Sequence, residues 1–355
     1  MVSRRSFLAS IAASGAGALI PAASWADLGN PSFLAAAKDR AGRYALCGLT
    51  ATAQIAFRVD LPDRGHAAAA HSTRAEAVAF ARRPGTFALV LDCASGRVVQ
   101  RLESPQGRHF YGHGAYLQGG DVLVTTENDY ATGAGVLGIW DARRSYTRMA
   151  EIPTGGIGPH EVIRLPGTET LVVANGGIRT HPDSDRDKLN LDDMHPSLVY
   201  IDDGHITEKV TLPPEMAQAS IRHISARKDG MVAAALQWEG DPDRVIPLLM
   251  LHKAGQSPRL RMADGADQRA LQGYAGSVSF SGDGGQVAIT GPRGGAAHIF
   301  DPDSEDGPTI MRRMDVCGVA RSGDGLAFTD GMGGVICPDH AAVHDLAWDN
   351  HLVSL

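Results

Sequence analysis

Residues 160–175, HEVIRLPGTETLVVAN, contain two short apolar strands on either side of a Pro166-Gly167 turn. The first strand begins at His160 and the second ends at Asn175. Alternating apolar and polar residues around a turn dipeptide are typical of a β-hairpin. The same frame recurs in segments that begin at Glu76, His113, His223, Gly276, Cys317 and His344.

This recurrence decides the fold class. A unit of four short strands that repeats every ~40–50 residues is typical of a β-propeller, as in WD40-like repeats. Turn dipeptides follow most of the frames, and glycine is abundant, with 42 residues. The sequence therefore predicts an all-β protein with seven blades. Six or eight blades are the alternatives, because the long unit from His160 to His223 has room for an insertion.

The two ends of the chain are expected to meet. Only one strand fits after His344, whereas the strands from Tyr44 to about Ala70 have no inner strand of their own. We predict that the C-terminal strand, residues 346–355, completes the N-terminal blade. Such closure removes free sheet edges. Residues 27–41, before these strands, are expected to form an irregular or helical lead.

The N-terminus has the pattern of an export signal. Ser3-Arg4-Arg5-Ser6-Phe7-Leu8 is a twin-arginine motif, an apolar stretch follows, and Ser24-Trp25-Ala26 offers small residues for cleavage. We expect residues 1–26 to be a cleaved Tat signal peptide and residues 27–355 to be one periplasmic domain. The apolar stretch is too short for a membrane anchor, and no membrane span is expected elsewhere.

Charge and motifs exclude several function classes. The net charge is −7 without a basic block, which argues against nucleic acid as a partner. Nucleophile-elbow, zinc-protease, Walker A and Rossmann patterns are missing, so no nucleotide and no catalytic residue are assigned. The cysteines form no C-x-x-C-H motif for covalent haem. Whether Cys317 pairs with Cys337 is left open.

Equivalent positions of a propeller lie around one axis, so the frame residues should converge there. Imidazole nitrogen and thiolate sulfur suit Fe, Cu or Zn, but ligand bonds of only ~2.0–2.3 Å favour two or three neighbours, such as His113, His160 and His223. The alternative is that the histidines cap strands, bond to backbone or line a water channel. The candidate ligands are His113, His160, His223, His344, Glu76 and Cys317.

Further polar residues fall in or beside the loops between second and third strands. These loops should lie on the face where inner strands begin, which makes it the expected binding face. The charged loop 179–196 is interpreted as a lid or docking loop; it lacks the glycine and glutamate of an EF-hand. The candidates for orienting a ligand or substrate are Glu127, Asn128, Asn175, Arg179, His181, Arg222 and Gln237.

Seven short phrases carry a family resemblance: Tyr111-Gly-His-Gly114, Thr126-Glu-Asn-Asp129, Gly158-Pro-His-Glu161, Val173-Ala-Asn-Gly-Gly-Ile178, Thr180-His-Pro182, Lys188-Leu-Asn-Leu191 and Ile221-Arg-His223. Together they resemble the DUF1513 family of exported bacterial proteins with a propeller-like sequence. The likeness covers most of the chain after the signal. It implies periplasmic metal acquisition, because family members often lie beside genes for imelysin-like and di-haem peroxidase-like proteins.

The leading hypothesis is a monomeric periplasmic propeller that binds a transition metal, or a metal-handling partner, on its histidine-bearing channel face. It would be an accessory in iron or copper uptake rather than an enzyme. One alternative is a lactonase-like, metal-dependent hydrolase, which would need His113 or Glu127 for turnover. The other is a pure interaction scaffold that uses the 179–196 loop. More histidine than carboxylate on the ring favours binding over calcium-type hydrolysis.

Overall fold

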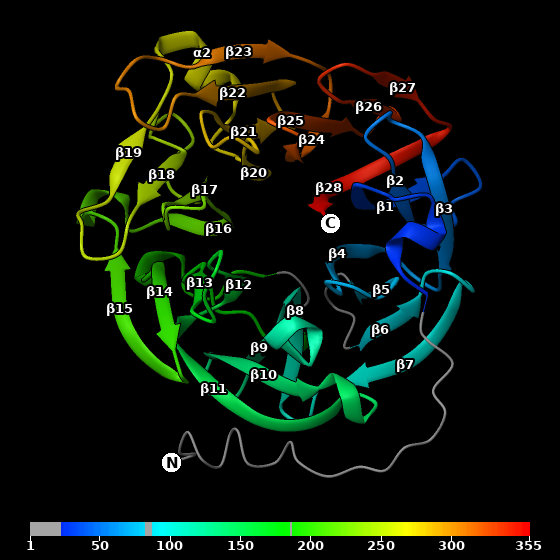
Figure 1. The fold of residues 1–355 in the computed structure, drawn as a ribbon. Helices are drawn as coiled ribbons and strands as arrows, with labels where there is room; N and C mark the ends of the chain where they lie inside the picture. The colour runs from blue at the N-terminus through cyan, green and yellow to red at the C-terminus, as the bar shows by residue number, and fades with distance from the viewer. Residues whose placement is uncertain (1–22, 82–86, 185–186) are drawn as a thin grey trace.

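Seven four-stranded antiparallel sheets surround one axis in the computed structural model, which describes residues 23–81, 87–184 and 187–355 (Figure 1). The predicted seven-bladed propeller is therefore confirmed. Most of the predicted signal peptide lies outside the described residues, so its export and cleavage stay predictions. Within the described ranges, no helix has the length and apolarity needed to cross a membrane.

Each blade places its first strand next to the axis, and the next strands follow outward. Blades 1 to 3 are β4 (Gly65–Ala70), β5 (Glu76–Ala81), β6 (Phe87–Asp92) and β7 (Arg97–Glu103); β8 (Arg108–Leu117), β9 (Val122–Asp129), β10 (Ala134–Asp141) and β11 (Thr147–Ile157); and β12 (Pro159–Arg164), β13 (Leu171–Asn175), β14 (Ser197–Asp202) and β15 (His205–Thr211).

The remaining blades follow the same order from the axis outward. Blades 4 to 7 are β16 (Ala219–Ala226), β17 (Val232–Trp238), β18 (Leu249–His252) and β19 (Arg259–Arg261); β20 (Ser277–Phe280), β21 (Val287–Gly291), β22 (Ala296–Phe300) and β23 (Thr309–Arg312); β24 (Val316–Ser322), β25 (Gly325–Asp330), β26 (Gly334–Ile336) and β27 (Ala341–Val343); and β28 (Leu346–Ser354), β1 (Phe33–Asp39), β2 (Tyr44–Leu49) and β3 (Ile55–Leu61).

The C-terminal strand closes the ring, as predicted. β28 pairs antiparallel with β1, from Phe33 opposite Ser354 to Asp39 opposite Leu346. Figure 1 shows the red β28 beside the blue β1 and β2. The expected irregular lead is wrong for residues 33–39, which form β1, a strand whose first five residues, Phe33 to Ala37, are buried. Alanine-rich strands carry a weak sequence signal, because alanine has little β-propensity.

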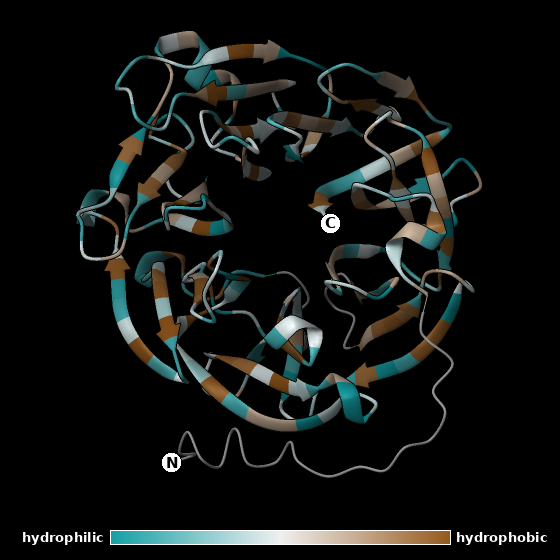
Figure 2. Cartoon of the chain, in the orientation of Figure 1, coloured by the Kyte–Doolittle hydropathy of each residue, from teal (hydrophilic) through white to brown (hydrophobic). Residues whose placement is uncertain are grey.

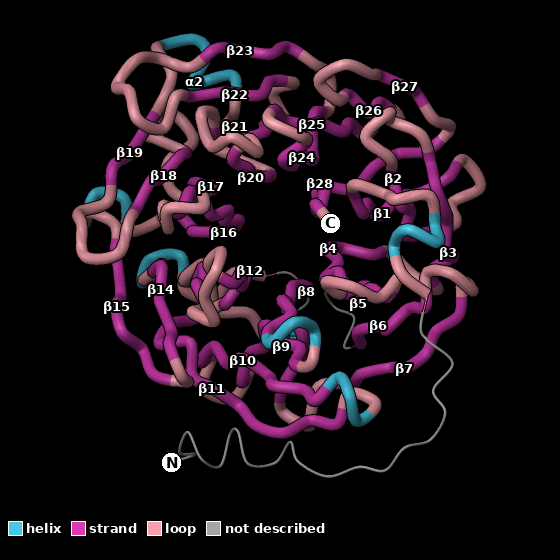
Figure 3. Tube along the Cα trace, viewed as in Figure 1, coloured by secondary structure: helices cyan, strands magenta, loops and turns pink. Residues whose placement is uncertain are grey.

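Helical structure in the described residues is limited to short segments, one before β1 and the others between strands (Figure 3). They are η1 (Trp25–Leu28), η2 (Gln118–Gly120), η3 (Ala142–Arg144), η4 (Pro182–Ser184), η5 (Leu191–Asp193), η6 (Pro214–Met216) and α2 (Gly265–Ala270). The predicted cleavage point after Ala26 falls inside η1. There Trp25 donates its indole N–H to the carbonyl oxygen of His71 at 2.8 Å and stacks on Phe57.

The hydrophobic core lies between neighbouring blades, and apolar residues occur in strands all around the ring (Figure 2). Leu34 and Leu89 belong to one cluster that joins blades 7 and 1, and Leu137 and Val173 belong to another between blades 2 and 3. Because each blade buries both of its faces, apolar burial stabilises the whole circle rather than any single sheet.

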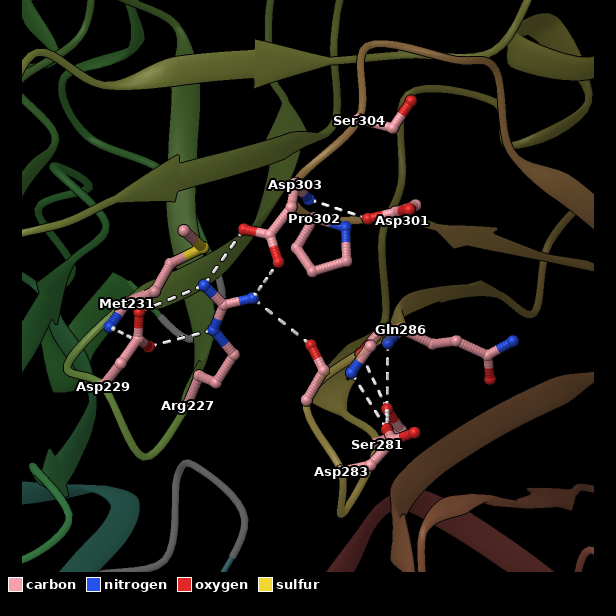
Figure 4. A network of polar contacts seen from close by, with 12 residues as sticks. Arg227, Asp229, Met231, Ser281, Asp283, Gln286, Asp301, Pro302, Asp303 and Ser304 are labelled. Carbon is pink, nitrogen blue, oxygen red and sulfur yellow. Dashed lines mark hydrogen bonds and ion pairs between the residues drawn. The ribbon is translucent and has the colours of Figure 1, made fainter.

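A guanidinium links blades 4 and 5 near the ends of their inner strands (Figure 4). Arg227 follows β16 and donates to Asp229 in its own turn, at 2.9 and 3.1 Å, and to Asp303 beyond β22, at 2.6 and 3.0 Å. Gly230 adopts a φ of 87° in that turn, a left-handed conformation that favours glycine. Hydrogen bonds from Arg227 lower the pKa of both Asp229 and Asp303.

The Arg227→Met variant should be less stable than the wild type near pH 7, by about 1 kcal/mol, because Asp229 and Asp303 are partly exposed. Carboxylates with depressed pKa values stabilise the fold above their ordinary pKa of about 4, and this contribution is lost as the pH falls through the lowered values. Urea unfolding at pH 7 and pH 3 measures this. The difference between the proteins should shrink at pH 3, whereas an equal difference at both values would contradict the ion-pair account.

Candidate metal centre

Five histidine side chains from five inner strands converge at the axis. His66 lies on β4, His113 on β8, His160 on β12, His223 on β16 and His351 on β28. Their ring centroids are 4.5 Å apart for His223 and His351, 4.7 Å for His160 and His223, and 4.6 Å for His66 and His351. We call these five residues the histidine cluster.

Irregular strand pairing aims these side chains at the axis. The regular register between inner and second strands skips His66 on β4, His113 on β8 and His160 on β12. In blade 7 it skips the segment that contains His351, and in blade 4 it skips Arg222, the neighbour of His223. A β-bulge bends its strand and redirects the extra residue, so the same local device recurs wherever a histidine faces the channel.

One carboxylate holds two of the rings. Glu161 Oε1 lies 3.4 Å from His113 Nδ1, and Glu161 Oε2 lies 3.3 Å from His223 Nδ1. The Ile224 backbone N–H donates to Glu161 Oε2 at 2.9 Å, which fixes the carboxylate. A carboxylate on one ring nitrogen orients the other nitrogen toward a ligand, as in carboxylate–histidine–metal arrangements.

Burial favours the neutral imidazole form of two members of the histidine cluster, His160 and His223. Burial lowers the pKa of His160 well below its ordinary value, and Arg222 and the neighbouring histidines add to this shift. Burial also lowers the pKa of His223, partly offset by Glu161. For Glu161 burial acts upward, but His113 and His223 outweigh it and the pKa is lowered. Neutral imidazoles beside an ionised carboxylate are the protonation states that a metal ion requires.

The donor atoms are close enough to share a metal ion. Two groups, His66 with His113 and His351, and His113 with His160 and His223, each have candidate ligand atoms within 4.8 Å of one another. Tetrahedral bonds of ~2.0–2.1 Å place ligand nitrogens ~3.3 Å apart, so small side-chain movements would close either group. His113 Nε2 and His160 Nδ1 are buried without a hydrogen-bond partner among the described residues.

A cavity of about 410 Å³ lies on the axis against the cluster. All seven inner strands line it, and His113, Glu161, His223 and His351 form its closed end. Its other end reaches the turns that follow the inner strands, which include Lys228 and Asp283. The binding face expected from the sequence was the opposite one, where inner strands begin, so that expectation is wrong for this cavity.

Three predicted ligands lie outside the histidine cluster. Glu76 begins β5, a second strand, and its carboxylate binds Arg74 and the hydroxyl of Tyr146. His344 precedes β28, and its Nε2 lies 2.9 Å from the carbonyl oxygen of Ala53. Cys317 is on an inner strand, but it is buried in the core between blades 6 and 7.

Burial raises the pKa of the Cys317 thiol to about 12, so it is a poor thiolate donor. Cys317 and Cys337 are both free thiols, which answers the open question about their pairing.

Sequence reasoning missed His66 and His351. His66 lies in the segment Gly65-His-Ala-Ala-Ala-Ala70, whose alanines give no strong strand signal. The repeat pattern therefore assigns the inner strand of this blade to the segment at Glu76, which is one strand too late. A usable signal existed for His351. Once the C-terminal strand is an inner strand, every histidine within it is a candidate for the axis, and His351 lies inside that strand whereas His344 precedes it.

Among the residues predicted to orient a ligand or substrate, Arg222 is the one that the structure brings to the histidine cluster. It is partly buried, with its guanidinium 3.6 Å from Glu239, and it contributes to the low pKa of His160. Gln237 donates to the carbonyl of Ala275, whereas Asn175 donates to the carbonyl of Thr154 and to the hydroxyl of Ser197.

The other residues predicted to orient a ligand lie beside neighbours outside the histidine cluster. Asn128 is buried beside Glu127 on β9. Arg179 donates to the carbonyl of Ala131, and His181 lies 3.6 Å from Asp183.

The loop that follows β13 is anchored on the face where inner strands begin. Asn190 accepts from the Arg179 N–H at 2.7 Å, Lys188 forms an ion pair with Glu239, and Tyr111 bonds to Thr180 at 2.9 Å. The loop therefore lies at the opposite end of the channel from the mouth of the axial cavity. Its interpretation as a docking loop stays a prediction.

Glu127 is fully buried and belongs to a structural ion pair within blade 2. Its two oxygens accept from Arg148 on β11 at 2.7 and 3.0 Å, and Thr125 also donates to it. Removing the guanidinium in Arg148→Met should cost roughly 3–5 kcal/mol, because a buried carboxylate loses its cation. Metal affinity should stay unchanged. Chemical unfolding and a metal titration of the same variant test both statements, and a stable variant with weakened metal binding would reverse the assignment.

The comparisons with known proteins agree with the fold. A chain of Kuenenia stuttgartiensis hydrazine synthase is similar over 81% of this chain and 86% of its own, with a TM-score of 0.60 and 15% identity. A chain of a nidogen/laminin complex (TM-score 0.50, 12% identity, 91% and 98% covered) and Kluyveromyces lactis Hsv2 (TM-score 0.50, 11% identity, 88% and 91% covered) are also similar. At such low identity these likenesses show the propeller fold alone.

At the sequence level, no curated protein matches the chain. One family model, described as "Protein of unknown function (DUF1513)", matches residues 59–355, from β3 to the C-terminal residue. The match covers six blades completely, and it includes the closing strand β28 and all five residues of the histidine cluster. The chain belongs to the DUF1513 family.

Proposed function

We propose that this protein binds one transition metal ion at the histidine cluster, with His113, His160 and His223 as ligands. His66 and His351 are the nearest additional donors. Glu161 holds the rings of His113 and His223 by their Nδ1 atoms and supplies a negative charge beside the ion. The other sequence-predicted ligands, Glu76, His344 and Cys317, have no part in this site.

The observation that carries the proposal is the convergence of buried, lone-pair-bearing nitrogens on one point. His113 Nε2 and His160 Nδ1 have no hydrogen-bond partner in the described part of the chain, although each is buried. Leaving such an atom unsatisfied costs about 1–3 kcal/mol. A metal ion satisfies both atoms, and it offsets the cost of crowding five imidazoles into one place.

The donor set favours a borderline metal. Imidazole nitrogen suits Cu, Zn, Fe and Ni, whereas Ca²⁺ and Mg²⁺ need several oxygen ligands and find one carboxylate here. Among divalent ions, Cu²⁺ is expected to bind most tightly, with Zn²⁺ and Fe²⁺ weaker. Iron or copper handling in the periplasm, with imelysin-like or di-haem peroxidase-like partners, rests on the family resemblance. It is the biological setting that we propose for the site.

Elemental analysis and metal titration test the proposal. Protein exported through its own signal and purified without chelator should contain about one equivalent of Cu, Zn or Fe, and metal-free protein should take up one equivalent. The His113→Ala/His160→Ala double variant should take up none at the same concentrations. Wild-type protein that binds no transition metal, or a double variant that binds as the wild type does, would overturn the proposal.

A further inference from the structure

We infer that the axial cavity binds a small polyanion of the carboxylate class, which enters from the face where the inner strands end and lies beside the histidine cluster. Its position next to a metal ion rests on the proposed function, whereas its binding in the cavity does not. The inference follows from the shape of the cavity, the charges at its mouth and the polar groups on its wall.

The cavity has the size and shape of a small-molecule site. Its volume of about 410 Å³ falls within the ~300–1,000 Å³ that is usual for ligand pockets. Small side chains of the inner strands line the cavity, such as Ala68 and Ala70 on β4 and Ala320 on β24. One end is closed by the cluster and the other reaches solvent, so a ligand that enters must approach His113, His223 and Glu161.

The mouth carries two unpaired cations, although the whole chain has a net charge of −7. Four cationic side chains line the cavity toward its mouth, Arg164, Arg227, Lys228 and Arg321, against one acidic side chain there, Asp283. Arg227 and Arg164 are already paired with carboxylates. Lys228 and Arg321 have no acidic partner within the described residues, and both are exposed. The two unpaired cations leave a local excess of positive charge at the mouth, which attracts anionic ligands.

The wall offers hydroxyl groups on one side. Ser277, Ser279 and Ser281 alternate along β20 and its end, and all three line the cavity. Ser281 donates to Asp283 at 2.6 Å, and Ser279 donates to the carbonyl of Phe280 at 2.9 Å. Ser281 also accepts from the Gln286 N–H at 2.9 Å. Because both hydroxyl protons are already donated, the remaining lone pairs of these two oxygens can only accept, from a hydroxyl group of the ligand. Unpaired cations at the mouth and acceptor oxygens on the wall fit a carboxylate that also carries a hydroxyl group, such as a hydroxycarboxylate, better than an apolar or cationic ligand.

An anion of this kind could also coordinate a metal ion held by the histidine cluster at the closed end of the cavity. Three imidazoles leave a metal ion with open coordination positions, and carboxylate oxygen is a common additional ligand. His223 and His351 border the cavity, whereas His66 and His160 do not line it. Open positions on the cavity side would therefore face the incoming anion.

Calorimetric titration of metal-free protein with citrate tests the inference, with pyrophosphate and sorbitol as further probes. Citrate should bind, its affinity should fall as salt rises, and sorbitol should give no signal. Lys228→Gln/Arg321→Gln should weaken citrate binding about tenfold or more, because the two unpaired cations at the mouth are lost. The matched control, Lys38→Gln/Arg97→Gln, removes two exposed charges outside the cavity and should bind citrate as the wild type does.

The outcomes separate this inference from the proposed function. Stronger binding of pyrophosphate than of citrate, with the same dependence on Lys228 and Arg321, would support an anion site but replace the carboxylate class by phosphate. No binding of either anion, or equal binding in the Lys228/Arg321 and control variants, would overturn it. If no metal binds, the function proposal fails, and the metal-free titration still decides the inference. With Cu²⁺ bound, citrate should change the Cu²⁺ electron paramagnetic resonance spectrum in the wild type.

Discussion

The His113→Ala variant should lose at least 100-fold in affinity for Cu²⁺ or Zn²⁺, the largest effect expected for any single histidine. His113 belongs to both groups of candidate ligands, and its Nδ1 contacts Glu161 while its buried Nε2 lacks a partner among the described residues. Removal of a direct ligand should exceed the 10–100-fold loss that is typical of outer partners. Competition titration with a chromophoric chelator measures the affinity.

Three further variants test whether the loss of metal affinity in His113→Ala is specific to the histidine cluster. Glu161→Gln keeps the shape but weakens the hold on two rings, so a loss of about 10–100-fold is expected. His344→Ala and His205→Ala remove histidines that lie outside the cluster, and both should bind metal as the wild type does. A loss in His344→Ala as large as that in His113→Ala would contradict the placement of the site.

Deletion of residues 346–355 should abolish cooperative folding. β28 is the inner strand of blade 7, and it buries Trp348 and Leu352 between blades. Truncating one buried apolar side chain of this size costs about 2–5 kcal/mol, and the whole stability of a domain is about 5–15 kcal/mol. The deletion also removes the strand pairing with β1 and the 2.7 Å ion pair between Arg64 and Asp349. Circular dichroism with thermal and urea unfolding measures the result.

A shorter deletion provides the control. Removing Leu355 alone leaves β28 complete, so the protein should unfold cooperatively with nearly the wild-type midpoint. A synthetic peptide of residues 346–355, added to the long deletion, should restore part of the native signal, because the gap between β24 and β1 matches this strand. A long deletion that unfolds as cooperatively as the wild type would show that the ring does not depend on this closure.

The sequence predicted the architecture well, because propeller blades repeat. The frames at His113, His160 and His223 each lie on an inner strand, and the leftover C-terminal strand closes the ring as expected. The error at Glu76 has a local cause. β4 is built from alanine after Gly65 and His66, so it lacks the β-branched and aromatic residues that mark a strand. The long His160–His223 unit holds a loop and not an extra blade.

The site was predicted less completely, because bulges are not visible in a strand pattern. The register irregularities that turn His66, His113, His160 and His351 toward the axis depend on pairing with the second strand. Glu161 shows the same limit. It follows His160 directly in the sequence, yet its importance comes from contacts with His113 and His223 on two other blades.

The most direct test of the account is the crystal structure of the protein with Cu²⁺ or Zn²⁺, measured at the absorption edge of the metal. The account predicts one strong anomalous peak on the propeller axis, ~2.0–2.1 Å from ring nitrogens of His113 and two other members of the histidine cluster. Peaks at exposed histidines only, with no density between His113, His160 and His223 at full metal saturation, would contradict the central claim.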